Sequence, residues 1–312
     1  VCKVIKVQTP RGAVANRVIH QVDPEAITIA EDMSGMPGVA SPIEDGGMGF
    51  DYRMNMGTPD YWIKLLKEKR DEEWHVGDLF YELTNKREEE HTISYAESHD
   101  QALVGDKTIF FRLVDKAIYS SMGVFDKNVI IDRGMSLHKM IRLVTIGTAA
   151  DGYLNFMGNE WGHPEWIDFP REGNGWSYEH ARRLWSLLDD ESLRFRFLNV
   201  FDKAMIQMVT DTRVFHWRPE PLVRDNERQV LIFTRGDYLF VFNFNPEKSF
   251  PDYAFDAPSG KYTSVLDTDN KSFDGLGRID EKIEHFTRYI SPGRGQLSLY
   301  IPARTGFVLQ RS

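Results

Sequence analysis

Short apolar runs alternate with helix-like stretches over the first two thirds of the chain. Four runs, at residues 26–30, 49–54, 91–96 and 152–157, have the length and composition of buried β-strands that end on polar residues. Between them, apolar residues recur three and four positions apart, as on one face of a helix. These helical sets lie at residues 59–69, 110–118, 137–144, 181–188 and 197–208. The alternation predicts an α/β region over residues 1–210, with a parallel sheet or part of a barrel.

The pattern changes to a purely strand-like one after residue 211. Residues 229–235 and 238–245 alternate like strands, and Gly236-Asp237 between them is typical of a two-residue hairpin turn. Further strand-like runs lie at residues 261–266, 296–301 and 305–310. We therefore expect a separate antiparallel β domain over residues 211–312, arranged as a sandwich.

Composition narrows the classes of partner. The 312 residues are 41% hydrophobic and 27% charged, and the formal net charge is -9. An acidic chain without a clustered basic face argues against a nucleic-acid partner, whereas a neutral polymer requires no particular charge. No apolar run is long enough to cross a membrane, so we expect no membrane partner. Cys2 is the only cysteine, which excludes an intrachain disulfide and favours an intracellular compartment.

Two carboxylates each follow a predicted strand. Glu31 ends the first run, and Asp100 follows the third run, next to His99. Carboxylates that converge at the open end of a barrel suit glycoside chemistry, because one delivers a proton and another stabilises positive charge at the sugar carbon. The alternative is that both acids cap helices or lie in solvated loops, and that His99 is structural.

Tryptophans gather after the fourth run, at positions 161, 166 and 176. Trp161 could stack on the apolar face of a sugar, or it could pack the barrel against the next helix. Other chemistries lack their motifs: there is no glycine-rich phosphate loop and no metal-binding histidine spacing. We expect neither a cofactor nor a metal.

Whole segments are similar to those of a known family. Residues 27–37 (ITIAEDMSGMP) resemble the fifth-strand motif of the starch and glycogen branching enzymes, members of the α-amylase superfamily. Residues 46–53 (GGMGFDYR) resemble the sixth-strand segment, and residues 95–101 (YAESHDQ) the seventh-strand motif. Residues 131–140 and 153–174 are similar to the helix beyond that strand and to the eighth strand with its loop. The series runs in order from about residue 13 to the C-terminus.

The resemblance implies a fold and a reaction. The fold is a (β/α)8 TIM barrel, of which residues 1–210 supply strands five to eight, followed by the C-terminal sandwich. The reaction is a retaining cleavage of an α-1,4 bond and transfer to a 6-hydroxyl, with starch, amylopectin or glycogen as substrate. By this resemblance Glu31 is the general acid/base, Asp100 stabilises the transition state, and His99 and Trp161 contact the sugar. The compartment would be the cytoplasm or a plastid.

The chain departs from the family pattern in what it lacks. The nucleophilic Asp of the family lies in an Arg-x-Asp motif on the fourth strand, and neither that strand nor the first three are present; Trp161 stands where Phe is more usual. The leading hypothesis is therefore a branching-enzyme portion that is active only with the missing N-terminal half as its partner. The alternatives are a glucan-binding or regulatory fragment without catalysis, and a hydrolytic relative such as an isoamylase or α-amylase.

Overall fold

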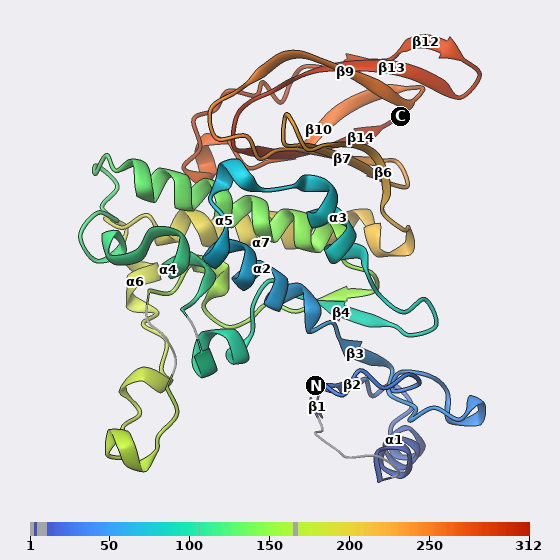
Figure 1. Ribbon diagram of the computed structural model, residues 1–312, viewed down its shortest axis with the longest axis vertical. Helices are drawn as coiled ribbons and strands as arrows, with labels where there is room; N and C mark the ends of the chain where they lie inside the picture. The colour runs from blue at the N-terminus through green and yellow to red at the C-terminus, as the bar shows by residue number, and fades with distance from the viewer. Residues whose placement is uncertain (1–2, 5–10, 106, 165–167) are drawn as a thin grey trace.

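The computed structural model describes residues 3–4, 11–105, 107–164 and 168–312 of the chain. Its α/β region is built on a five-stranded sheet with the order β1-β2-β3-β4-β5 (Figure 1). The strands are β1 Lys3–Val4, β2 Thr28–Ala30, β3 Tyr52–Met54, β4 Thr92–Ser94 and β5 Gly152–Tyr153. Because all neighbouring pairs are parallel, the carboxyl ends of the strands lie on one side of the sheet.

Seven α-helices accompany this sheet within the described residues. They are α1 Arg11–Val22, α2 Gly57–Glu68, α3 Val76–Thr84, α4 Ile109–Val114, α5 Val129–Thr148, α6 Ser186–Asp189 and α7 Phe195–Thr212. The longest, α5, begins where the Asn128 side chain accepts hydrogen bonds from the backbone N–H groups of Ile130 and Ile131. Nearly every residue of α5 from Gly134 onward is buried, so this helix is the centre of the main core.

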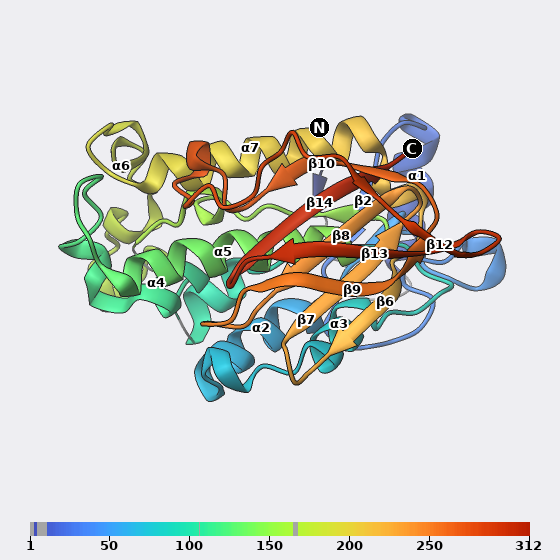
Figure 2. The same ribbon diagram turned by 90° about the horizontal axis from the view of Figure 1, so that it is seen from above.

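The C-terminal region is entirely β and forms two antiparallel sheets. One sheet has the order β11-β10-β14-β8-β7-β6 and the other β12-β13-β9, and the second lies over the first (Figure 2). The strands are β6 Glu220–Asp225, β7 Val230–Arg235, β8 Tyr238–Asn243, β9 Phe250–Pro258, β10 Lys261–Asp267, β11 His285–Phe286, β12 Arg288–Ser291, β13 Arg294–Ile301 and β14 Thr305–Arg311. Alternate residues of β13 are buried against the larger sheet, as expected for a sandwich.

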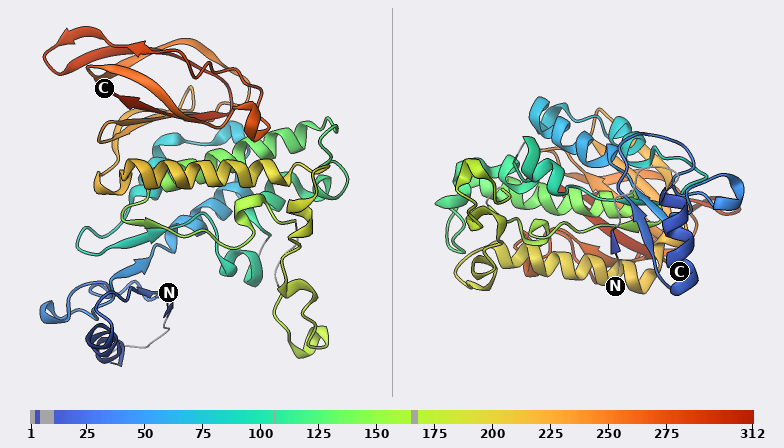
Figure 3. Two further views of the ribbon diagram at one scale, coloured as in Figure 1. Left: turned by 180° about the vertical axis from the view of Figure 1, so that it is seen from behind. Right: turned by 90° about the horizontal axis from the view of Figure 1, so that it is seen from below.

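The larger sheet has helices on its second face. Every residue of β7 is buried. On the side that the smaller sheet leaves open, α3 packs against β7, α5 against β8 and β14, and α7 against β10 (Figure 3). The approach is close at Gly147 of α5, where an added Cβ would lie 2.9 Å from the ring of Phe240. The buried guanidinium of Arg235 donates hydrogen bonds to the carbonyls of Gly147 and Ala149 at the end of α5. The two regions therefore share one hydrophobic core.

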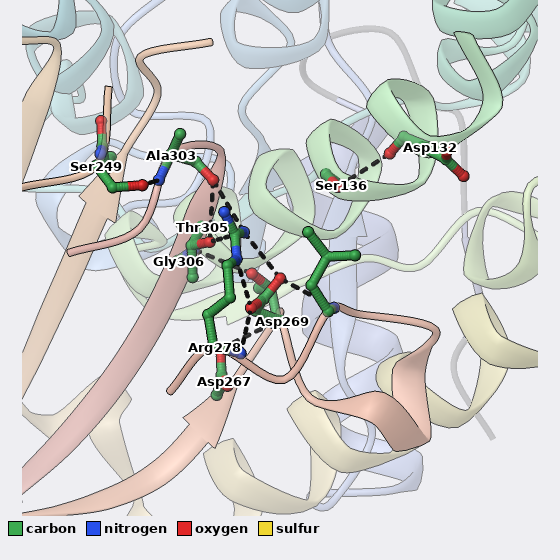
Figure 4. Close-up of polar contacts among 12 residues, drawn as sticks. Asp132, Ser136, Ser249, Asp267, Asp269, Arg278, Ala303, Thr305 and Gly306 are labelled. Atoms are coloured by element: carbon green, nitrogen blue, oxygen red, sulfur yellow. Dashed lines mark hydrogen bonds and ion pairs between the residues drawn. The ribbon is translucent and has the colours of Figure 1, made fainter. Parts of the chain in front are cut away.

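A polar cluster fixes the loop that follows β10. Arg278 donates to both carboxylate oxygens of Asp269, to the carbonyl of Ala303 and to the hydroxyl of Thr305 (Figure 4). The guanidinium lowers the pKa of Asp269, against the burial that would raise it. The loop is thereby held against β14, at the end of the sheet that is nearest to α7.

The structure agrees with most predicted elements and corrects two. The predicted helix at 59–69 is α2, and the predicted hairpin is β7–β8, with Gly236 at a φ of 58° in its turn. The sheet, however, has five strands and not four, because β1 pairs with β2. The continuous helix expected over residues 181–188 is wrong, since the α-helical part of this segment is only the start of the short helix α6, Ser186–Asp189. No helix in the described parts of the chain is long and apolar enough to span a membrane.

Candidate active site

Glu31 follows β2 and Asp100 follows β4, and these two strands are separated in the sheet only by β3. Glu31 comes directly after β2, and Asp100 begins a π-helical turn, Asp100–Gly105, six residues beyond the end of β4. Because β2, β3 and β4 are parallel, both segments leave the sheet on the same side. The fold therefore brings together two acids that are 69 positions apart in the sequence.

His99 lies between the two carboxylates. Its Nε2 atom is 3.3 Å from Oε1 of Glu31 and also 3.3 Å from Oδ1 of Asp100. The three side chains are partly open to solvent, with exposed fractions of 42% for His99, 17% for Glu31 and 32% for Asp100. Each of the three side chains is thus accessible to a ligand.

A hydrogen-bonded network behind the site holds the turn that carries Asp100. Gln101 accepts hydrogen bonds from the backbone N–H and the hydroxyl of Ser98, each at 3.0 Å. Its amide then donates to Asp60 of α2 at 3.0 Å, and the backbone N–H of Asp100 donates to Ser98 at 3.3 Å. Ser98, Gln101 and Asp60 are positioning residues that the sequence analysis missed; the only available signal was that Ser98 and Gln101 flank the two predicted site residues.

Two buried ionisable groups, Tyr95 and Glu97, lie between the end of β4 and the site residues His99 and Asp100. Burial raises the pKa of the Tyr95 phenol, and the negative charges of Asp100, Asp60 and Glu31 raise it further. Burial also raises the pKa of Glu97 to about 7, although this carboxylate accepts a hydrogen bond of 2.5 Å from the backbone N–H of Ile109. Tyr95 therefore stays neutral. The hydrogen bond of Glu97 links the segment before Asp100 to Ile109, the first residue of α4.

The predicted stacking role of Trp161 is wrong for this structure. Trp161 is completely buried, and its ring lies 5.0 Å from that of His163, 5.8 Å from that of Trp185 and 5.6 Å from that of Phe195. A sugar can stack only on an exposed ring face, and Trp161 has none. Trp161 therefore packs in the core, which is the alternative that the sequence left open. Trp176 is exposed, and Trp166 lies outside the described residues.

Glu31, His99 and Asp100 also have the spacing of metal ligands. In the described parts of the chain, no other group of three His, Cys, Asp or Glu side chains has it. One ligand atom from each of Glu31, His99 and Asp100 lies within 4.8 Å of the others. Two carboxylates with an imidazole can hold a divalent cation, but they are also what a glycoside site uses. The expectation that the chain needs no metal remains a prediction.

Comparison with known proteins agrees with the resemblance seen in the motifs. Residues 222–312 match the family described as alpha amylase, C-terminal all-beta domain. The 1,4-alpha-glucan-branching enzyme of Rhizophagus irregularis is 50% identical over 303 residues, which are 95% of this chain and 44% of that protein. Those of Solanum tuberosum and Felis catus are 50% and 48% identical, and the matches cover 32% and 43% of their lengths.

Solved structures agree in fold. A debranching enzyme from Nostoc punctiforme superposes with a TM-score of 0.57 at 13% identity, over 97% of this chain and 55% of that one. An α-amylase from H. orenii gives 0.52 at 15% identity, over 96% of this chain and 56% of that one. This chain spans less than half of the length of the curated relatives. Over the part that it covers, the chain belongs to the 1,4-α-glucan branching enzyme family.

Proposed function

We propose that this chain supplies the acid/base and charge-stabilising half of a glucan branching site. The observation that carries the proposal is the meeting of Glu31 and Asp100 around His99 at the carboxyl side of the sheet. The substrate would be an α-1,4-linked glucan such as starch, amylopectin or glycogen. The single cysteine fits a reducing compartment, in the cytoplasm or a plastid.

In the proposed reaction each residue has one task. Glu31 protonates the glycosidic oxygen as the α-1,4 bond breaks, and later removes the proton from the acceptor's 6-hydroxyl. The carboxylate of Asp100 stabilises positive charge at the sugar carbon in both transition states. His99, with its imidazole between the two acids, donates a hydrogen bond to a sugar hydroxyl. Transfer prevails over hydrolysis when the acceptor chain excludes water from the site.

A nucleophile has to come from another polypeptide segment. A retaining site needs a second carboxylate about 5–5.5 Å from the acid/base, on the opposite face of the sugar. We place it on the strand next to β2 in a completed (β/α)8 barrel, of which β2 to β5 would be strands five to eight. β1 lies at that edge, but residues 1–30 contain no Arg-x-Asp motif. Five strands also cannot close an eight-stranded barrel, which supports the need for a partner half.

Complementation tests the proposal. The N-terminal portion of the Rhizophagus irregularis relative, ending where its match to this chain begins, would be mixed with this chain and with linear amylose. New α-1,6 branches would be counted by NMR or by debranching. We expect branching from the mixture and none from either polypeptide alone. A mixture that associates but forms no branches would overturn the proposal.

A second candidate, glucan binding without catalysis, has one observation in its favour. Trp176 and Tyr178 lie in a segment that projects from the molecule, and both rings are exposed (Figure 1). Rings of this kind stack on sugars without any nucleophile. Affinity electrophoresis of the chain in glycogen gels separates the candidates, because retardation without branching in the complemented mixture favours binding alone. A hydrolytic role is less well supported, since the relatives that are about 50% identical are named branching enzymes.

A further inference from the structure

A cavity lies between the five-stranded sheet and the segment that leads from α7 to β6. Its volume is about 360 Å³, within the roughly 300–1,000 Å³ of pockets that bind small molecules. Asn55 and Ser94, at the ends of β3 and β4, form part of its wall, and Lys86 and Arg218 bring two positive charges to it. The end of α3 also lines it, on the side of the molecule where β4 and β6 lie (Figure 1). None of the three residues of the candidate active site lines this cavity, so it is a separate feature.

Three cationic side chains at this cavity are close enough to repel one another. Burial lowers the pKa of Lys86, and the positive charges of Arg218 and Arg235 lower it further, against the attraction of Asp151. Burial also lowers the pKa of Arg235 to about 10, and the charge of Arg218 adds to the effect. Arg235 is completely buried and donates its hydrogen bonds to backbone carbonyls. The positive charge of Arg235 is therefore held by dipoles, and it adds to that of the other two cations.

The carboxylates around the cavity balance these cations only in part. Asp151 is 3.3 Å from Nζ of Lys86, but it is also 3.2 Å from Nδ1 of His91. Glu88 lines the cavity and is exposed. Arg218 makes no ion pair with any other described residue. Three cations against these two acids leave an excess of one positive charge, which attracts anions to the cavity.

Two neutral polar side chains in the wall are available to a ligand. Ser94 is only 2% exposed, yet its hydroxyl makes no hydrogen bond to the described parts of the chain. The side-chain amide of Asn55 likewise has no hydrogen-bond partner among the described residues. A buried polar group without a partner costs free energy, so such groups are generally hydrogen-bonded. A polar ligand in the cavity would supply the missing partners.

We propose that this cavity is a binding site for a small molecule that carries a phosphate group. A phosphate monoester has about 1.5 to 2 negative charges at pH 7 and three acceptor oxygens, which suits a wall with more than one cation better than a carboxylate does. Arg218 and Lys86 would bind the phosphate through charge-assisted hydrogen bonds. Ser94 and Asn55 would bind its oxygens or the hydroxyls of an attached sugar. The proposal is independent of the branching reaction, because no residue of that site takes part.

The test measures phosphate binding to this chain directly. Titration calorimetry would follow the binding of sodium phosphate and of glucose 6-phosphate, at one ionic strength that is set with sodium chloride. Arg218→Gln removes an exposed cation from the cavity, and Glu88→Gln removes the acid from the same wall. Arg288→Gln, at an exposed position on β12, is the matched control. Circular dichroism would establish that all three variants keep the secondary structure of the unaltered chain.

We expect Arg218→Gln to weaken the binding of both probes by roughly tenfold or more, because a charge-assisted hydrogen bond is lost. Glu88→Gln should strengthen binding by a few-fold, since it removes a repelling charge, and the control should bind like the unaltered chain. Tighter binding of glucose 6-phosphate than of phosphate would identify a sugar phosphate as the ligand, and equal binding would identify the free anion. The absence of binding by both probes would overturn the proposal, as would equal affinities for Arg218→Gln and the control or weaker binding by Glu88→Gln.

Discussion

At the scale of single residues, the candidate site consists of partly exposed side chains that rest on buried ones. Glu31, His99 and Asp100 are partly open to solvent, whereas Ser98 and Glu97 beneath them are almost completely buried. The first group is open to a ligand, and the second group binds the backbone around it, through the hydrogen bonds of Ser98 to Asp100 and Gln101 and of Glu97 to Ile109. Substitutions in the two groups should therefore affect different measurements.

Removal of the proposed proton donor, Glu31, should lower turnover and leave glucan binding unchanged. In the complemented enzyme, Glu31→Gln should lower the branching rate by about 10²-fold or more, because an amide cannot deliver or accept the proton. Asp100→Asn should lower it similarly through the loss of charge stabilisation. Glucan affinity, measured by affinity electrophoresis, should change little. Glu25→Gln, at an exposed position before β2, is the matched control; a near-normal rate for Glu31→Gln would remove it from the acid/base role.

Glu97 should make stability depend on pH. Burial raises the pKa of its carboxyl from 4.5 to about 7 in the folded protein, so its contribution to stability is fully present below pH 4.5 and is lost as the pH rises through 7. A pKa difference of this size corresponds to roughly 3 kcal/mol. Glu97→Gln keeps an acceptor for the N–H of Ile109 but cannot ionise.

The measurement is urea unfolding of both proteins between pH 5 and pH 8. The free energy of unfolding of Glu97→Gln, relative to that of the unaltered chain, should rise by roughly 2–3 kcal/mol across this range. The exposed substitution Glu25→Gln should show no such trend. A constant difference between Glu97→Gln and the unaltered chain would mean that Glu97 does not titrate there.

The sequence predicted that Glu31 and Asp100 would meet, but it did not predict that Trp161 would be buried. Glu31 and Asp100 were predictable because a parallel sheet brings the ends of its strands to one side, whatever their separation in sequence. Trp161 was not, because a ring packed in a core and a ring stacked on a sugar have the same local sequence. Its burial depends on Phe195, which is 34 positions away and on a different helix.

At the scale of elements, whether a predicted strand or helix forms depends on whether the fold provides a surface that buries its apolar residues. The β7–β8 hairpin was predictable because its turn residues and apolar strands agree with each other. The helix expected at residues 181–188 was not, although its apolar spacing was correct. Leu184 and Trp185 are each more than 40% exposed, and without a surface to cover them the periodicity does not maintain a helix.

Close packing between α5 and the larger sheet gives a prediction at this scale. Gly147→Ala would normally favour a helix by about 1 kcal/mol. Here the new methyl group would lie 2.9 Å from Phe240 and 3.2 Å from Phe233, so we expect a net loss of about 1–3 kcal/mol in the free energy of unfolding. Gly77→Ala in α3 is the matched control, since its nearest contact would be at 3.4 Å. If Gly147→Ala proved neutral in urea unfolding, the rings would be free to move away.

At the scale of the whole molecule, the α/β region and the sandwich both contribute side chains to one hydrophobic core. Phe233 and Phe240 stack at 5.0 Å on the helix-facing side of the larger sheet, within the same core cluster as Met140 and Ile141 of α5. Arg235 links the same sheet to the end of α5. The sequence showed a change of texture near residue 211, but it could not show that both sides of that boundary bury one core.

A shared core predicts that the chain unfolds in one step. Helix content, followed by circular dichroism at 222 nm, and tryptophan fluorescence should give coincident urea transitions. Phe240→Ala should lower the free energy of unfolding by about 3–5 kcal/mol and shift both transitions together, because the ring lies between sheet and helix. Phe286→Ala, on exposed β11, should shift neither. Two separate transitions, with only one of them sensitive to Phe240→Ala, would show that the two regions are stable independently and that α5 does not need the sheet above it.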